Sequence, residues 1–533
     1  MNNEVNINEE LNQIKLHLRQ LSIPDLQEIM PGVGDFMHEM GEMITPLSLS
    51  DAIVNIHNTA IFEDKKIRDK LTEIHDLPNL SRWNNGKKCR DALSHMNLSD
   101  VFLPQASITR ELFKDNSPES PMHDYQNWLK KKVSKMIVFE DKRKLMVQMP
   151  TGAGKTWTMM ESIYDYFRLS EIQNPGVIWL AHTDELCEQA IESFNIGWDK
   201  KGSFDVTSLR LWGGNIGKIS QIPSGPFFAV LSFQSAYSMI TSTKDKMDDI
   251  FQTLRQRSNL IIIDEAHLAL AETYRFNLEQ LQKHDSKIVG LTATPGRHGI
   301  NETNKETAAL ANFFDKNIKN LKEFCLEKEQ QTPIEYLQSR GILSKVEYAP
   351  LKTDYDIELN QSEKSILART LELPDSVLAS AAKDNQRNGI IVAHIIKLVR
   401  EHNKKILVFA PTKDNASFLA ALLNLRGINA RSVTGETSAS HRKRAVKDFR
   451  EKKFDVLLNF GVFTTGFDDP SIDCVLIARP TASVVLYSQM VGRGLRGPMN
   501  GGTPDCLLVD VIDNLEKQPD LILASKFFQD AWE

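Results

Sequence analysis

A glycine-rich segment of this chain ends in a lysine and a threonine: residues 149–156 read Met-Pro-Thr-Gly-Ala-Gly-Lys-Thr. An apolar run at 145–148 precedes it and a helical pattern follows it, so we expect strand, turn and helix in that order. In such a turn, backbone N–H groups and the helix N-terminus surround phosphates, the lysine reaches the β and γ phosphates, and the threonine hydroxyl ligates Mg²⁺. The segment therefore predicts a site for ATP and Mg²⁺. Its contributors are Thr151, Gly152, Ala153, Gly154, Lys155 and Thr156.

Two adjacent acids, Asp264 and Glu265, follow a second apolar run at 260–263. An isolated pair of this kind can simply begin a helix, because carboxylates favour the positive end of the helix dipole. Beside a phosphate-binding turn, the pair instead indicates ATP hydrolysis. We predict that Asp264 holds the Mg²⁺, that Glu265 orients and deprotonates the attacking water, and that Lys155 stabilises charge on the phosphates.

A parallel sheet would bring these two segments together, and the apolar runs predict one. The runs at 145–148, 177–181, 227–231, 260–263 and 288–291 are short, continuous and separated by helical stretches. This pattern is typical of strands that are buried on both faces of a parallel sheet. The alternation stops near residue 300 and resumes at 406–410, 456–459, 475–478 and 507–511. The predicted fold class is therefore α/β, with two parallel-sheet lobes in tandem.

The rest of the chain completes the predicted division into domains. Apolar residues three or four apart, such as Ile14 and Leu18 or Ile67 and Leu71, predict a helical N-terminal domain. A polar, Pro-rich segment at 115–121 predicts a linker. The predicted units are a helical accessory domain (1–116), a first lobe that binds ATP (117–299), a helical connector (300–340), a second lobe (341–515) and a C-terminal tail (516–533).

Composition and charge exclude several classes of protein. The 533 residues are 41% hydrophobic and 25% charged, without a run of 18 apolar residues, which argues against disordered and membrane-spanning chains and for a cytoplasmic address. The net charge is -6, yet residues 1–60 hold nine acids and two bases, which leaves +1 for the remainder. The body of the protein can thus form a basic groove. The acidic segment suits a basic protein partner or serves only as a soluble cap.

Five short motifs occur in an order that resembles superfamily 2 helicases of the DEAD/DEAH-box class. The narrower resemblance is to the branch with restriction-enzyme motors and repair helicases. The motifs are Pro150 to Thr156, Asp264 to His267, Thr292 to Pro295, Gly461 to Asp468 and Gln489 to Arg496. The resemblance implies two RecA-like lobes with ATP in the seam between them. It also implies an ATP hydrolase that is stimulated by nucleic acid, with DNA favoured over RNA.

The same resemblance assigns roles to further residues of the seam. Arg493 and Arg496 would act as arginine fingers from the second lobe, and their spacing of three places them on one face of a helix, although such a pair can also be a solvated basic face. Gln126 would recognise adenine, or else is an exposed polar helix residue. Gly466 and Asp468 would complete the nucleotide site. Coupling between ATP and the strand would fall to His267, Thr292, Thr294 and Gln489.

The motifs expected to hold nucleic acid carry hydroxyl and amide groups, which bind phosphates of any base sequence. The candidates are His182, Thr183, Ser232, Gln234, Thr434, Gly435 and Thr464. Two positions depart from the family pattern. Thr183 and Asp184 stand where relatives often carry basic residues, and Thr465 replaces a common glutamate.

Three functions are compatible with these motifs. The first is an ATP-driven helicase or translocase. The second is an ATP-gated switch, in which closure of the lobes regulates a protein docked on the acidic N-terminal domain. The third is the motor subunit of a restriction or antiviral defence complex, in which another polypeptide would cleave the nucleic acid.

Overall fold

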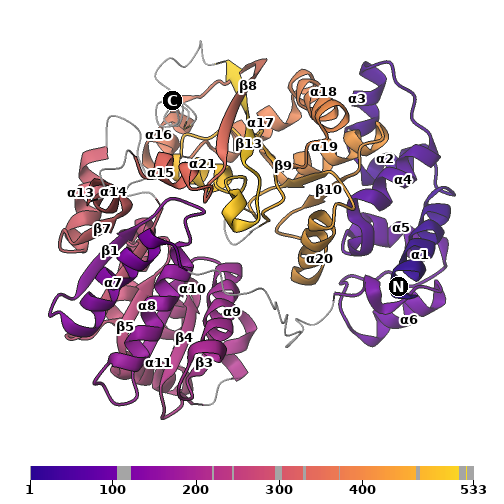
Figure 1. Ribbon diagram of the computed structural model, residues 1–533. Helices are drawn as coiled ribbons and strands as arrows, with labels where there is room; N and C mark the ends of the chain where they lie inside the picture. The colour runs from indigo at the N-terminus through magenta and orange to yellow at the C-terminus, as the bar shows by residue number, and fades with distance from the viewer. Residues whose placement is uncertain are drawn as a thin grey trace.

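The computed structural model describes residues 2–104, 122–218, 221–242, 245–293, 303–327, 332–370, 372–463, 469–514 and 524. These residues form a helical N-terminal domain and two α/β lobes, each built on a parallel sheet (Figure 1). Within the described ranges, no helix combines the length and the apolar character needed to cross a membrane. All five cysteines are buried and free.

The described part of the N-terminal domain, residues 2–104, forms helices and no strand, as the sequence predicts. Side chains of Ser22, Thr45 and Asp64 accept hydrogen bonds from the first turns of α2, α4 and α5, which fixes where these helices begin. Apolar residues three or four apart then face one core, as with Ile67 and Leu71 in α5. The helices are α1 (Asn2–Leu18), α2 (Ile23–Ile29), α3 (Val33–Glu39), α4 (Pro46–His57), η1 (Asn58–Ala60), α5 (Lys65–Ile74), α6 (Lys87–His95) and η2 (Asp100–Phe102).

Lobe 1 is a seven-stranded parallel sheet in the order β3-β4-β2-β5-β6-β1-β7. Strands β2 and β4 are buried along their whole length, in agreement with the continuous apolar runs. The strands are β1 (Lys144–Gln148), β2 (Gly176–Ala181), β3 (Thr207–Leu211), β4 (Phe227–Ser232), β5 (Ser258–Ile263), β6 (Lys287–Thr292) and β7 (Ile318–Asn320). The helices are α7 (Asp124–Phe139), α8 (Lys155–Leu169), α9 (Asp184–Lys201), η3 (Gly213–Lys218), α10 (Phe233–Ile240), α11 (Asp245–Arg257), η4 (Ala266–Leu268) and α12 (Glu272–Leu281).

Lobe 2 is a six-stranded parallel sheet in the order β10-β11-β9-β12-β13-β8. Its strands are β8 (Lys345–Asp356), β9 (Ile406–Phe409), β10 (Ala430–Val433), β11 (Val456–Asn459), β12 (Cys474–Ile477) and β13 (Asp505–Asn514). Its helices are α16 (Gln361–Thr370), α17 (Asp375–Lys383), α18 (Asn385–His402), α19 (Lys413–Leu425), α20 (Ala439–Arg450), α21 (Val484–Val491) and η5 (Pro498–Asn500). Of the predicted tail, Ala524 is described, and it is buried with its N–H donating to the carbonyl oxygen of Thr481.

The segment between the lobes differs from the helical connector predicted for residues 300–340. It contains α13 (Thr303–Phe313), α14 (Leu321–Glu327) and α15 (Pro333–Ser339), but also strand β7. Strand β7 pairs with β1 and becomes the edge of the lobe 1 sheet. A three-residue strand with half-buried side chains has no apolar run, which explains why the sequence does not reveal it.

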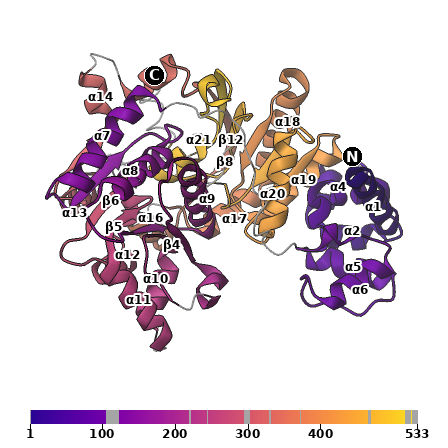
Figure 2. The same cartoon turned by 60° about the horizontal axis from the view of Figure 1, so that its bottom comes forward.

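The N-terminal domain packs on lobe 2 (Figure 2). Helix α4 lies against α19, and the two units share one continuous cluster of buried hydrophobic residues. The rings of Phe36 and Phe418 meet edge to face, with centroids 5.7 Å apart. Two acidic side chains of the N-terminal segment also contact lobe 2: Glu42 pairs with Arg426 at 2.7 Å, and Glu39 accepts a hydrogen bond from Asn385 at 2.7 Å.

Candidate functional site

The glycine-rich turn lies between β1 and α8, as its sequence predicts. Gly152 and Gly154 have φ angles of 84° and 79°, the left-handed region that glycine adopts without strain. A Cβ on Gly154 would also lie 2.4 Å from Nε2 of Gln126, so a side chain here would displace that amide from its contact with the turn. Two residues of α7 hold the turn from behind: Tyr125 Oη and Gln126 Nε2 donate to the carbonyl oxygen of Ala153 at 2.9 and 3.1 Å.

Lys155 begins α8 and faces the two predicted acids, which follow β5. Its Nζ lies 3.3 Å from Oε1 of Glu265 and 3.9 Å from Oδ1 of Asp264. Burial acts to lower the pKa of Lys155, but the two carboxylates outweigh it and hold the pKa above its ordinary value. The ammonium is therefore charged and available to a phosphate group.

The two carboxylates differ in their electrostatics. Burial raises the pKa of Asp264 to about 6, despite the nearby ammonium of Lys155. Burial acts in the same direction on Glu265, but Lys155 and His267 outweigh it, so the pKa of Glu265 is lowered. Glu265 also has φ 53° and ψ 55°, a left-handed conformation that costs about 1–2 kcal/mol in a residue with a Cβ. The fold thus holds a strained, ionised carboxylate beside the lysine.

His267 connects this acid pair to the end of β6. Its Nδ1 lies 3.4 Å from Oε2 of Glu265 and 3.5 Å from Oγ1 of Thr292. His267 and Thr292 are both buried. A shift at Glu265 can therefore reach the neighbouring strand through two contacts.

Two predicted arginines of lobe 2 follow α21, but they do not share a helix face as their spacing suggests. The helix ends at Val491, and Arg496 instead forms an isolated antiparallel bridge with Leu343. Two glycines after Val491 explain the early end, since glycine is a poor helix former. The positive charge of Arg493 acts against protonation of Lys155 and helps to lower the pKa of Glu265. Arg493 therefore lies within electrostatic reach of both residues of lobe 1.

Close backbone contacts hold this arginine segment against the glycine-rich turn. A Cβ on Gly492 would lie 2.2 Å from Cγ2 of Thr151, and one on Gly152 would lie 3.0 Å from Cδ2 of Leu343. The two lobes thus meet over the predicted phosphate site. The sequence does not identify Tyr125 or Gly492 as site residues. The sequence does hold one clue to Gly492: a glycine within a helical pattern often marks a place where another part of the protein approaches the backbone closely.

Four of the seven residues predicted to hold nucleic acid lie in lobe 1, at or just after the ends of β2 and β4. They are His182, Thr183, Ser232 and Gln234. His182 and Gln234 are exposed, and His182 contacts the Tyr274 hydroxyl. The hydroxyls of Thr183 and Ser232 instead accept hydrogen bonds from the first turns of α9 and α10. Ser232 is buried. Of these four residues, His182 and Gln234 therefore have the side chains that a bound strand could reach most easily.

Lobe 2 places Thr434 and Gly435 in a turn between β10 and α20. Thr434 is half-exposed and Gly435 is exposed. Near this turn, Arg442 of α20 pairs with Glu185 of α9 at 2.6 Å, a contact between the lobes. Gln489 lies half-buried in α21. Predicted residues Thr294, Thr464, Gly466 and Asp468 lie outside the described residues.

Comparisons with known proteins agree with the two-lobe architecture. Residues 119–297 match the family described as type III restriction enzyme, res subunit, and residues 390–497 match the helicase conserved C-terminal domain. A solved structure of the ATP-dependent type ISP restriction-modification enzyme LlaBIII bound to DNA superposes with a TM-score of 0.50. It is 16% identical and covers 85% of this chain and 32% of that chain, which shows a shared fold.

Two yeast proteins are among the relatives. The putative ATP-dependent helicase IRC3 of Saccharomyces cerevisiae is 30% identical over 263 residues, which are 48% of this chain and 34% of that protein. The putative mitochondrial ATP-dependent helicase irc3 of Schizosaccharomyces pombe is 29% identical over 387 residues, which are 71% of this chain and 55% of that protein. The matched regions thus span between a third and just over half of these relatives.

Proposed function

Because this chain belongs to the superfamily 2 helicases, we propose that it is an ATP-driven motor that moves along nucleic acid, with DNA favoured over RNA. The observation that carries the proposal is the seam itself. The segment of lobe 2 that carries Arg493 packs on the glycine-rich turn of lobe 1, where a Cβ on Gly492 would lie 2.2 Å from Cγ2 of Thr151. A triphosphate in this seam would contact both lobes, so its hydrolysis would change how strongly they hold together.

The residues of the seam divide the work of hydrolysis. The glycine-rich turn surrounds the phosphates with N–H groups, and Lys155 exchanges its carboxylate contacts for phosphate oxygens. Glu265 then accepts a proton from the water that attacks the γ-phosphorus, while the bond from that phosphorus to the bridging oxygen of ADP breaks. Arg493 and Arg496 stabilise the charge that develops on the transferred group. Gln126, which is buried and already donates to the Ala153 carbonyl, would recognise adenine beside the turn.

The oxygen donors of the site fit Mg²⁺. The Thr156 hydroxyl and the Asp264 carboxylate are hard ligands. The raised pKa of Asp264 shows that burial disfavours its ionised form, which a cation would stabilise. Among the described residues, no group of three or more His, Cys, Asp or Glu side chains could hold a metal by itself. Phosphate oxygens and water would therefore complete the coordination, where the ion neutralises phosphate charge.

The decisive experiment compares ATP hydrolysis in the presence of single-stranded and double-stranded DNA and RNA at one stated salt concentration. The salt must be fixed because affinity for a phosphate backbone falls steeply as salt rises. We expect stimulation by at least one polynucleotide, and the largest effect with DNA. A basal rate that no polynucleotide changes would contradict the motor.

A second candidate is the motor subunit of a restriction or defence complex. The match of residues 119–297 to a restriction-enzyme subunit family favours it. Purification of the native protein should then recover a DNA-cleaving or DNA-modifying subunit, and its repeated absence would count against this candidate. A separate protein partner of the acidic N-terminal domain and a cytoplasmic location both stay predictions.

A further inference from the structure

The turn between β10 and α20 is held mostly by its own polar groups. The Thr434 N–H donates to Oγ1 of Thr437 at 3.2 Å, and the Glu436 N–H donates to Oγ1 of Thr434 at 3.3 Å. Ser438 then caps α20 by accepting from the His441 N–H at 3.4 Å. Under the proposed function, this turn contacts the nucleic-acid backbone. Its geometry would therefore affect how tightly lobe 2 holds a strand.

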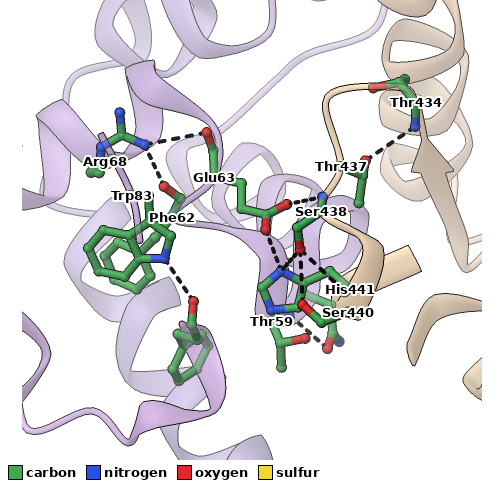
Figure 3. Close-up of polar contacts among 12 residues, drawn as sticks. Thr59, Phe62, Glu63, Arg68, Trp83, Thr434, Thr437, Ser438, Ser440 and His441 are labelled. Carbon is green, nitrogen blue, oxygen red and sulfur yellow. Dashed lines mark hydrogen bonds and ion pairs between the residues drawn. The ribbon is translucent and has the colours of Figure 1, made fainter. Parts of the chain in front are cut away.

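A carboxylate from the N-terminal domain reaches the base of this turn (Figure 3). Glu63 accepts a hydrogen bond from the Ser438 N–H at 2.9 Å through Oε2, and its Oε1 lies 2.8 Å from Nδ1 of His441. Burial acts to raise the pKa of Glu63, but the contacts with His441 and Ser438 outweigh it and hold the pKa below its ordinary value. Glu63 is therefore an anion at neutral pH, at the helix end where the dipole favours one.

The segment that carries Glu63 is itself fixed. The buried guanidinium of Arg68 donates to the carbonyl oxygens of Phe62 and Glu63 at 2.6 and 3.4 Å. The ring of Phe62 stacks on Trp83 with centroids 4.8 Å apart, and Trp83 Nε1 donates to the carbonyl oxygen of Phe102 at 2.9 Å. Few degrees of freedom remain on the N-terminal side. The carboxylate is thus presented to lobe 2 from a rigid support.

The turn is not tightly packed against the N-terminal domain on the side that faces the cavity between them. A cavity of about 120 Å³ lies between the N-terminal domain and lobe 2, and His57, Arg431, Thr434, Thr437 and Arg444 are among the residues that line it. The turn can move into such a space unless polar contacts hold it. Among the described residues, the hydrogen bonds of Glu63 to Ser438 and His441 join the start of α20 to the other domain.

We propose that Glu63 is a positioning residue for nucleic-acid binding, through which the N-terminal domain fixes the turn at Thr434 to Thr437 in lobe 2. The inference rests on the proposed function. It assigns the acid-rich N-terminal domain a task inside the chain: it sets the affinity of lobe 2 for a strand. The ATP seam lies elsewhere, so the domain does so without changing the basal chemistry.

The test compares the full-length variants Glu63→Gln and Glu42→Gln with the unaltered chain. Both substitutions remove one charge from the same domain interface, but Glu42 contacts Arg426, away from the turn. Two quantities are measured at fixed salt: binding of a fluorescent single-stranded oligonucleotide, and the oligonucleotide concentration that gives half-maximal ATPase stimulation. For Glu63→Gln we expect both the dissociation constant and this concentration to rise about fivefold, because a charged hydrogen bond is lost. The basal kcat and the KM for ATP should not change, and Glu42→Gln should leave all four values unchanged.

Further variants and outcomes separate positioning from general damage. Glu63→Asp keeps the charge and should recover part of the affinity, and a thermal melt identifies any variant that fails to fold. Equal affinity in Glu63→Gln and the unaltered chain would overturn the inference alone. An equal loss in Glu42→Gln would also overturn it, since the effect would then belong to domain docking in general. If the unaltered chain neither binds nor responds to any oligonucleotide, the proposed function fails, and this inference fails with it.

Discussion

The side chains of Lys155, Asp264 and Glu265 at the seam shift one another's pKa. Lys155 has a raised pKa because two carboxylates face it, and Glu265 has a lowered pKa because Lys155 and His267 outweigh its burial. Before a nucleotide enters, the ammonium is thus paired with the same group that would later accept a proton from water. Under the proposed function, a triphosphate would compete for the lysine and release the base, which would tie activation of water to the presence of ATP.

The exchange of Glu265 for Gln separates binding from chemistry. The Glu265→Gln variant keeps the size of the side chain but cannot accept the proton of the attacking water. We expect turnover to fall by roughly 10²- to 10⁴-fold while ATP still binds. Single-turnover hydrolysis and a binding assay with labelled nucleotide measure the two effects. Unchanged turnover would assign the base to another residue.

Gly492 offers a steric test of the seam. Its φ is -58°, so alanine adds no backbone strain, but the new Cβ would lie 2.2 Å from Cγ2 of Thr151. We expect Gly492→Ala to lower kcat/KM for ATP by about tenfold, since the lobes would have to separate to relieve the overlap. Gly225→Ala is the matched control, because no atom lies within 4 Å of a Cβ at that position. Equal kinetics in both variants would show that the lobes do not close in this way.

At the level of elements, α9 and α20 connect the two lobes through Glu185 and Arg442. The pair spans 2.6 Å and is partly exposed, so its own contribution to stability is small, about 1 kcal/mol or less. Under the proposed function, its position near the turn at Thr434 would give it a different role. A phosphate of a bound strand would compete with Glu185 for the guanidinium.

Removal of the competing acid should therefore strengthen binding to nucleic acid. We expect Glu185→Gln to lower the dissociation constant for a single-stranded oligonucleotide by roughly two- to fivefold, and more at low salt. Glu188→Gln is the matched control in the same helix, because Glu188 pairs with Arg210 inside lobe 1 at 3.0 Å. Fluorescence anisotropy over a salt series measures the change. Weaker binding by Glu185→Gln would mean that the interlobe pair assists the strand.

Elements that carry a strong local signal are the ones that the sequence predicts. Strands β1, β2, β4, β5 and β6, and in lobe 2 β9, β11, β12 and β13, coincide with continuous apolar runs. Strands at the sheet edges are different. β3 and β10 have partly exposed side chains, and β8 alternates between exposed and less exposed positions, so none of them forms a continuous apolar run.

The site follows the same rule. The glycine-rich turn, Asp264 and Glu265 are contiguous with predicted strands, and their positions follow from the sequence. The end of α21 before Arg493 follows from the glycines after Val491, but the close approach of Gly492 to Thr151 of the other lobe is a tertiary contact that the sequence does not show. The hydrogen bond from Tyr125 to Ala153 spans 28 residues and leaves no local pattern. Contacts of this kind become visible in the folded structure.

For the whole molecule, the shared core predicts that the N-terminal domain and lobe 2 unfold together. Phe36 is buried and meets Phe418 of lobe 2, so Phe36→Ala should remove about 3 kcal/mol or more from that joint transition. Met43→Ala is the control, since Met43 is 91% exposed. Calorimetry measures the midpoints. A separate early transition of the N-terminal domain, with the midpoint of lobe 2 unchanged, would contradict the shared core.

The order of the chain adds a constraint on movement. Lobe 1 lies in the sequence between the N-terminal domain and lobe 2, and those two units are packed together. In covalent terms, lobe 1 is an insertion into a larger body and is tethered to it at both ends. A lobe with a single hinge can swing widely, whereas a doubly tethered lobe can open only as far as its shorter connection permits. If the chain is a motor, as proposed, its stroke would therefore be limited by chain connectivity as well as by ATP.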